Sequence, residues 1–172
     1  MKLVLPGHLV ERLKSELLRA GSREIGGVLV AEHTGSATFR LADLSVQRCG
    51  GSQAHFVRDP IHSKKFLDEF FSRTGNDYQK FNYVGEWHSH PLFEPLPSHK
   101  DLASMKEIVE DPNVGVNFAV LMIVSLTNRS VLRLSATAFR PGVAPINVAV
   151  ITEIRGVHRS GWLERVIRFF RS

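Results

Sequence analysis

Apolar positions in the first half of the chain alternate between helical and strand-like spacing. Residues 6–19 and 61–73 place their large apolar side chains on one helical face, which predicts two amphipathic helices. The shorter apolar runs at 25–31, 39–46 and 54–57 contain β-branched or aromatic residues and predict strands. Helices and strands are therefore expected to interleave from the start of the chain.

The second half continues this alternation. The aromatic and β-branched run at 81–87 lacks proline and predicts a strand, and helical spacing follows at 101–109. The apolar runs at 118–126 and 131–139 are separated by a short polar segment and predict a hairpin, and a last strand is expected at 147–154. Together the elements predict an α/β fold, a single-domain mixed sheet flanked by helices.

The composition indicates one domain in a reducing compartment. The chain has 172 residues, of which 43% are hydrophobic, and this is enough for one core. The single cysteine, Cys49, cannot form an internal disulfide, which favours a cytoplasmic location. The start of the chain lacks the features of a secretory signal, and no segment approaches the ~20 apolar residues of a membrane span.

The charge distribution argues against nucleic acid as a partner. A formal net charge of +5 is compatible with nucleic-acid binding, but the basic residues are dispersed and form no recognisable RNA- or DNA-binding module. Basic and bulky apolar residues alternate in 158–172, which predicts an amphipathic helix or tail after a domain that spans 1–157. We expect this tail to dock on the domain, although covering a partner subunit or lying on a membrane surface stays open.

The clearest chemical signal lies where the strand predicted at 81–87 ends. His88 and His90 are two residues apart, so on a strand they share a face and can bind one metal ion. Pro91 ends the strand pairing, and Asp101 falls in the first turn of the next helix, where the helix dipole favours an anion. Two imidazoles and one carboxylate leave a zinc ion an open position for water, as in catalytic zinc sites.

A catalytic zinc centre also needs a group that carries protons. Glu24 precedes the strand predicted at 25–31, whose paired glycines allow close approach of another backbone. Its carboxylate is a candidate general base and general acid. Taken alone, its position beside Arg23 is more typical of a solvated ion pair than of a catalytic group.

The complete pattern resembles the JAMM (MPN-plus) metalloprotease family. The match consists of a Glu before a glycine-containing strand, then His-x-His-Pro, six residues, Ser, two residues and Asp. These positions are filled by Glu24, His88, His90, Pro91, Ser98 and Asp101. The run at 84–91 is also similar to the prokaryotic branch of the family, and the likeness covers roughly residues 24–140. The resemblance implies the MPN/JAB architecture, which is cytidine deaminase-like.

The resemblance also implies a role for each polar residue of the motif. Zinc ligands would be His88, His90 and Asp101; the general base and acid would be Glu24, and Ser98 would stabilise the oxyanion of the tetrahedral intermediate. A purely structural interpretation of these residues is the alternative to these catalytic roles. Ser98 followed three residues later by Asp101 resembles a helix capping box with Asp in place of Glu, and a histidine pair near a strand end can be purely structural.

The resemblance finally implies a zinc isopeptidase or peptidase that cleaves the bond after the C-terminal tail of a ubiquitin-like protein. The expected partners are such a modifier or its conjugates, with activating-like and conjugating-like enzymes in the same bacterial pathway. The tail is expected to add as a strand at a free sheet edge. Two alternatives stay open: a metallohydrolase acting on a sulfur-carrier or small-molecule conjugate, and a non-catalytic MPN scaffold.

Overall fold

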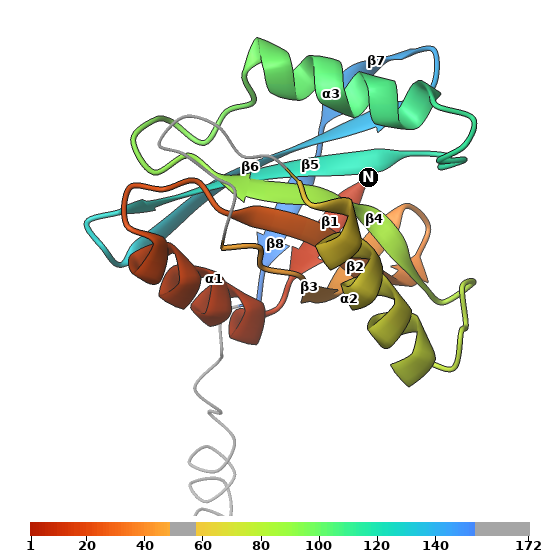
Figure 1. Cartoon of the computed structure of the whole chain (residues 1–172), viewed down its shortest axis with the longest axis horizontal. Helices are drawn as coiled ribbons and strands as arrows, with labels where there is room; N and C mark the ends of the chain where they lie inside the picture. The colour runs from red at the N-terminus through yellow and green to blue at the C-terminus, as the bar shows by residue number, and fades with distance from the viewer. Residues whose placement is uncertain (49–57, 154–172) are drawn as a thin grey trace, which may run out of the picture.

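In the part of the chain that the structure describes, eight strands form one mixed sheet, and three helices cover its two faces (Figure 1). The structure is a computed structural model, and it describes residues 1–48 and 58–153. The expected α/β class with a single mixed sheet is confirmed. The strand predicted at 54–57, Cys49 and the tail predicted at 158–172 lie outside the described residues.

The elements follow the predicted alternation closely. The strands are β1 (Lys2–Leu5), β2 (Gly26–Gly35), β3 (Thr38–Leu44), β4 (Phe81–Ser89), β5 (Ala119–Thr127), β6 (Val131–Arg140), β7 (Val143–Asn147) and β8 (Ala149–Thr152). The helices are α1 (Gly7–Ala20), α2 (Pro60–Arg73) and α3 (His99–Glu110). The strand order is β7-β6-β5-β4-β2-β3-β1-β8, in which β4 pairs parallel with β5 and β1 pairs parallel with both β3 and β8.

Helices α2 and α3 begin at residues whose side chains cap them. The Asp59 carboxylate accepts hydrogen bonds from the backbone N–H groups of Ile61 and His62, and Pro60 occupies the first helical turn, where no intrahelical donor is lost. Ser98 and Asp101 form the corresponding box at the start of α3. Residues at both helix starts, Pro60 and Ser98, line the same groove.

The two faces of the sheet carry separate cores. Helix α1 packs on one face through Leu9, Leu13 and Leu17, and α3 packs on the other through Met105 and Val109. Successive residues of β5 belong in turn to one core and to the other, because successive side chains of a strand point to opposite faces of the sheet. Each fully buried side chain of this size contributes about 1.5–3 kcal/mol of hydrophobic stabilisation. The strand β4 is therefore held firmly in the interior of the sheet.

The end of the sheet differs from the prediction. The strand expected at 147–154 is shorter in the structure, where β8 covers Ala149–Thr152 and pairs with β1, and β7, which pairs with β6, precedes it without having been predicted. Val148 separates the two strands, and its backbone N–H bonds to the carbonyl of Ala136 in β6 while its side chain is buried. Because β7 and β8 stand at opposite ends of the strand order, the sheet curls until its edges meet, and Figure 1 shows both strands crossing behind it. Strand β1 was not predicted at all.

An irregularity in β4 sets the direction of its side chains. The pairing with β2 shifts between Gly85 and Tyr83, so Val84 is an extra residue in β4. Gly85 has a φ of 145°, and a Cβ there would overlap the backbone oxygen of Val120 on the neighbouring strand. After this point Glu86 and His88 share one face of β4, toward the groove. None of the helices in the described part of the chain is long and apolar enough to cross a membrane.

Candidate metal centre

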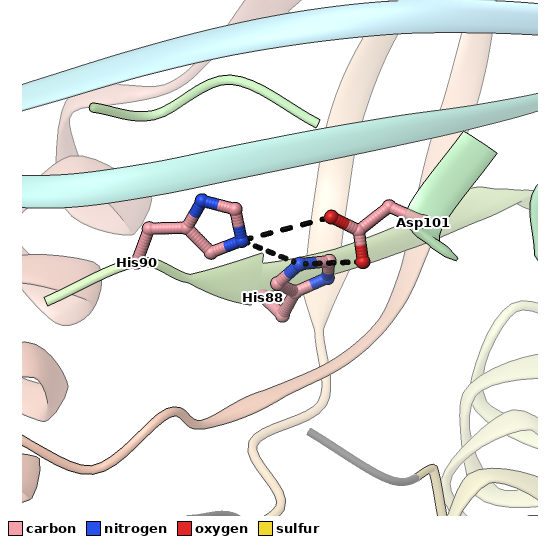
Figure 2. Close-up of side chains that lie close together, drawn as sticks. All are labelled: His88, His90 and Asp101. Atoms are coloured by element: carbon pink, nitrogen blue, oxygen red, sulfur yellow. Dashed lines mark hydrogen bonds and ion pairs between the residues drawn. The ribbon is translucent and has the colours of Figure 1, made fainter. Parts of the chain in front are cut away.

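Three side chains meet at the end of β4 in an arrangement suited to one metal ion. His88 Nε2 lies 3.1 Å from His90 Nε2 and 3.3 Å from Asp101 Oδ1, and His90 Nε2 lies 3.7 Å from Asp101 Oδ2 (Figure 2). Bonds of about 2.0–2.1 Å at tetrahedral angles separate zinc ligand atoms by about 3.4 Å. The donor set and its spacing therefore fit zinc, with a side of the cluster open to the groove.

The histidines owe their positions to the central strands. His88 is paired with Gly26 of β2 and Ile123 of β5, and the backbone N–H of His90 donates to the carbonyl of Val124 at 2.8 Å. Both imidazole-bearing residues are only 8% exposed. Because β4 is hydrogen-bonded on both sides, the two rings are held rigidly, as a metal site requires.

The start of α3 supplies the carboxylate. Ser98 Oγ accepts a hydrogen bond from the Asp101 backbone N–H at 3.2 Å, and Asp101 Oδ2 accepts one from the Ser98 backbone N–H at 2.7 Å. The capping box suggested by the sequence is thus present. It coexists with the metal cluster, because Asp101 Oδ1 still faces His88.

The same contacts set the ionisation of Asp101. Burial alone would raise the pKa of this carboxyl, but hydrogen bonds from His88 and Ser98 and the nearby imidazole outweigh it and hold the pKa well below its usual range. Asp101 is therefore an anion over the physiological range. This is the form that binds a metal.

Glu24 lies buried in the wall of the same groove. It is 6% exposed, and its neighbour Ile25 is fixed by a hydrogen bond from its backbone N–H to Ser89 Oγ at 3.0 Å. Burial raises the pKa of Glu24, although the two motif histidines oppose the shift. The solvated ion pair with Arg23 is wrong, because the described residues show no such pair and the carboxylate is buried.

The cluster opens into a groove of about 990 Å³ between α3 and the segment that precedes α2. On one side lies the loop after the motif histidines, where Phe93 and Leu96 are 61% and 62% exposed. This loop is tied to β6, since the two terminal nitrogens of the Arg133 guanidinium, Nη1 and Nη2, donate to the Glu94 carboxylate and Ser135 donates to the carbonyl of Pro95. The apolar side chains are thus presented to solvent on a fixed loop.

Two groove residues escaped the sequence interpretation, Arg58 and Glu86. Arg58 Nη1 donates to Glu86 Oε1 at 2.5 Å, and both line the groove. A signal for Glu86 existed, because it stands two residues before His88 and so shares its face of the strand. Arg58 carried no signal, since its place depends on how the chain packs. The free edge expected for a substrate tail does not adjoin the site among the described strands, because β4 is bonded on both sides.

The mixed sheet, with a His-His-Asp cluster at the end of a central strand and a buried glutamate beside it, defines a JAB-type domain. The family model described as prokaryotic homologs of the JAB domain matches residues 6–136, and the chain belongs to this family. This confirms the resemblance found in the sequence.

Individual proteins agree with the family. The chain is 29% identical over 149 residues to a "CD-NTase/cGAS isopeptidase" of Enterobacter hormaechei subsp. hoffmannii (strain UCI 50), covering 85% of this chain and 79% of that protein. A protein of the same name from Vibrio cholerae serotype O1 is 32% identical over 116 residues, covering 65% of this chain and 72% of that protein. The solution structure of protein DSY2949 from Desulfitobacterium hafniense superposes with a TM-score of 0.65 at 17% identity, covering 93% of this chain and 99% of that one, and supports the fold alone.

Proposed function

We propose that this protein is a zinc-dependent isopeptidase that hydrolyses the bond after the C-terminal tail of a ubiquitin-like modifier. The observation that carries the proposal is the approach of His88, His90 and Asp101 to within the reach of one ion, with Glu24 in the same groove. The isopeptidase names of two relatives support the class of reaction. These names also favour a protein of the CD-NTase/cGAS class as one party to the conjugate.

The proposed mechanism assigns one task to each residue. His88, His90 and Asp101 would hold zinc, which when bound lowers the pKa of a water molecule and polarises the scissile carbonyl. Glu24 takes the proton of the attacking water and passes it to the departing amine. Its raised pKa suits the second half of this task, because a more basic carboxylate is protonated for longer during the reaction. The Ser98 hydroxyl donates to the oxyanion of the tetrahedral intermediate.

The alternatives are weaker on two grounds. A non-catalytic scaffold needs no metal ligands, whereas this chain has a complete set in bonding range. Action on a sulfur-carrier or small-molecule conjugate finds no support in the names of the relatives, which specify an isopeptidase. Activating-like and conjugating-like enzymes as partners, a cytoplasmic location and the boundary of the catalytic domain near residue 157 stay predictions.

Glu24→Gln tests the proposed chemistry. The variant is expected to bind zinc as the wild type does, measured by elemental analysis, while cleavage of lysine-linked ubiquitin-like conjugates falls by about 10²–10⁴-fold, the contribution of a general base. Glu11→Gln is the matched control, because Glu11 is an exposed residue of α1 that pairs with Lys14, outside the groove lining, and the variant is expected to retain full activity. A chelator should abolish cleavage and added zinc should restore it. Cleavage that persists after the metal is removed would exclude the mechanism.

A further inference from the structure

The ion pair between Arg58 and Glu86 lines the groove but has no part in the proposed chemistry. The Glu86 side chain is 15% exposed and lies on the same face of β4 as the metal ligand His88. The Arg58 side chain is 37% exposed at the rim, where it is accessible to a substrate. Because part of this ion pair is exposed to the groove, it can also form hydrogen bonds with a bound substrate.

Arg58 is fixed in place by its chain neighbours. The backbone N–H of the next residue, Asp59, donates to Gln47 Oε1 at 2.7 Å, and the Asp59 side chain caps α2. Glu86 then orients the guanidinium by accepting from Nη1. A guanidinium carries five N–H donors, and the bond to Glu86 engages one of them while Arg58 lines the groove. A donor held in this way loses little conformational entropy when a ligand binds.

The charge of the pair selects the kind of acceptor. Because Glu86 already neutralises Arg58, a carboxylate of the substrate would place two anions on one cation, whereas a neutral backbone carbonyl adds no charge. The groove has apolar side chains such as Ile108 and Leu121 beside its polar ones, and Arg58 is the arginine among the described residues that line it. Among the described strands, β4 is paired on both sides, so it has no free edge of its own beside the site. Arg58 is thus suited to bind the backbone of an extended segment.

The spacing between Glu86 and His88 along β4 indicates which carbonyl of the substrate Arg58 would bind. Glu86 stands two residues from His88, a step of about 6.6–6.8 Å along a strand. An extended acyl segment presents a carbonyl every ~3.3–3.4 Å, so the second carbonyl before the scissile one matches this step. On the amine side, the methylene groups of a lysine separate the scissile nitrogen from any backbone.

We propose that Arg58 donates a hydrogen bond to the carbonyl of the third residue before the scissile bond, on the acyl side, and that Glu86 is the positioning residue that orients Arg58. This inference rests on the proposed function for the site. It assigns to the groove a recognition of the modifier tail through its backbone, independent of the side chains in the tail. Conjugates with shorter acyl groups would be processed without help from Arg58.

Peptides of one to five residues, each joined through its C-terminal carboxyl to the ε-amine of lysine amide, test this length dependence. Arg58→Met is expected to lower kcat/KM about 10-fold for acyl segments of three or more residues, mainly through KM, and to leave one-residue substrates unchanged. Arg58→Lys, which keeps the charge but not the planar fork, should recover part of the loss. Equal losses for all lengths, or no loss at all, would overturn the inference.

A double variant separates contact with the substrate from simple neutralisation. Arg58→Met leaves the Glu86 carboxylate without its cation, and Glu86→Gln removes that defect. If Arg58 contacts the tail, the double variant stays as deficient on long substrates as Arg58→Met. Recovery to the wild-type kcat/KM would show that Arg58 only neutralises Glu86 and would overturn the inference.

Binding distinguishes failure of this inference from failure of the proposed function. The affinity of the zinc-loaded protein for five-residue and one-residue peptide amides is measured by calorimetry for the wild type and the double variant. Loss of affinity for the longer peptide alone supports the role of Arg58 even if no peptide is cleaved. Cleavage with equal affinities for both proteins would retain the isopeptidase and remove Arg58 from substrate binding. A wild type that neither binds nor cleaves the peptides would refute both.

Discussion

Replacement of Ser98 tests whether one hydroxyl serves both helix and reaction. Ser98 Oγ accepts from the Asp101 backbone N–H at 3.2 Å, and Ser98→Ala removes this bond. The reciprocal bond from the Ser98 backbone N–H to Asp101 Oδ2, at 2.7 Å, does not depend on the side chain and should survive. The carboxylate therefore keeps a fixed position in the variant.

The expected losses in stability and in activity differ in size. Loss of a capping side chain costs about 1 kcal/mol of folding stability. Because Ser98 is exposed, water can take the place of its hydroxyl and accept from the Asp101 N–H. For a chain of this length that is a fall in Tm of roughly 2–4 °C. Loss of an oxyanion donor costs about 2.7–4 kcal/mol in the transition state, or roughly 10²–10³-fold in kcat. Ser98→Gly should lower Tm even less, because glycine is a tolerable cap.

Thermal unfolding, zinc content and cleavage rate are measured on the same preparations of the three proteins. We expect Ser98→Gly and Ser98→Ala to retain zinc and to lose activity alike, although their stabilities differ. If activity instead follows the cap, so that Ser98→Gly cleaves as fast as the wild type, the hydroxyl has no part in stabilising the oxyanion. The capping box would then account for Ser98 completely.

Two further predictions concern stability. Arg48 hydrogen bonds lower the pKa of buried Glu16 from 4.5, so Glu16→Gln should reduce the free energy of unfolding at pH 7 by about 1 kcal/mol. Because the folded pKa is the lower one, this difference should shrink as the pH falls below about 4.5, measured by urea unfolding at each pH. Gly85→Ala should cost at least about 1–3 kcal/mol through overlap with Val120, while Gly35→Ala, in open space, should cost far less in the same assay.

Much of the site was readable from the sequence because its residues are close along the chain. His88 and His90 depend only on a strand period, and Asp101 on a helix start that Ser98 marks. Local rules of this kind hold wherever a strand and a helix form. The approach of these three side chains, which could hold a metal ion, was therefore predictable once the strand and the helix were.

The rest depends on contacts between distant segments. The burial of Glu24 follows from the pairing of the adjacent strand β2 with β4, and Arg58 bonds to Glu86, which lies 28 residues away in the sequence. The boundary at Val148 was not predicted, because the pairing partner changes there from β6 to β1 and the apolar pattern does not mark that change. Periodicity gives the face of a residue but not the element that will cover it.

The parallel contact between β1 and β8 has a consequence during synthesis on the ribosome. Leu3 of β1 is paired with Val150 of β8, so this strand pair cannot form until nearly all of the described chain has emerged. Until then the outer edge of β1 is open and can template pairing with another chain. The rate of translation, rather than the rate of chain folding, would then limit how soon the β1 edge is covered. A nascent chain on a stalled ribosome would keep this aggregation-prone strand edge exposed.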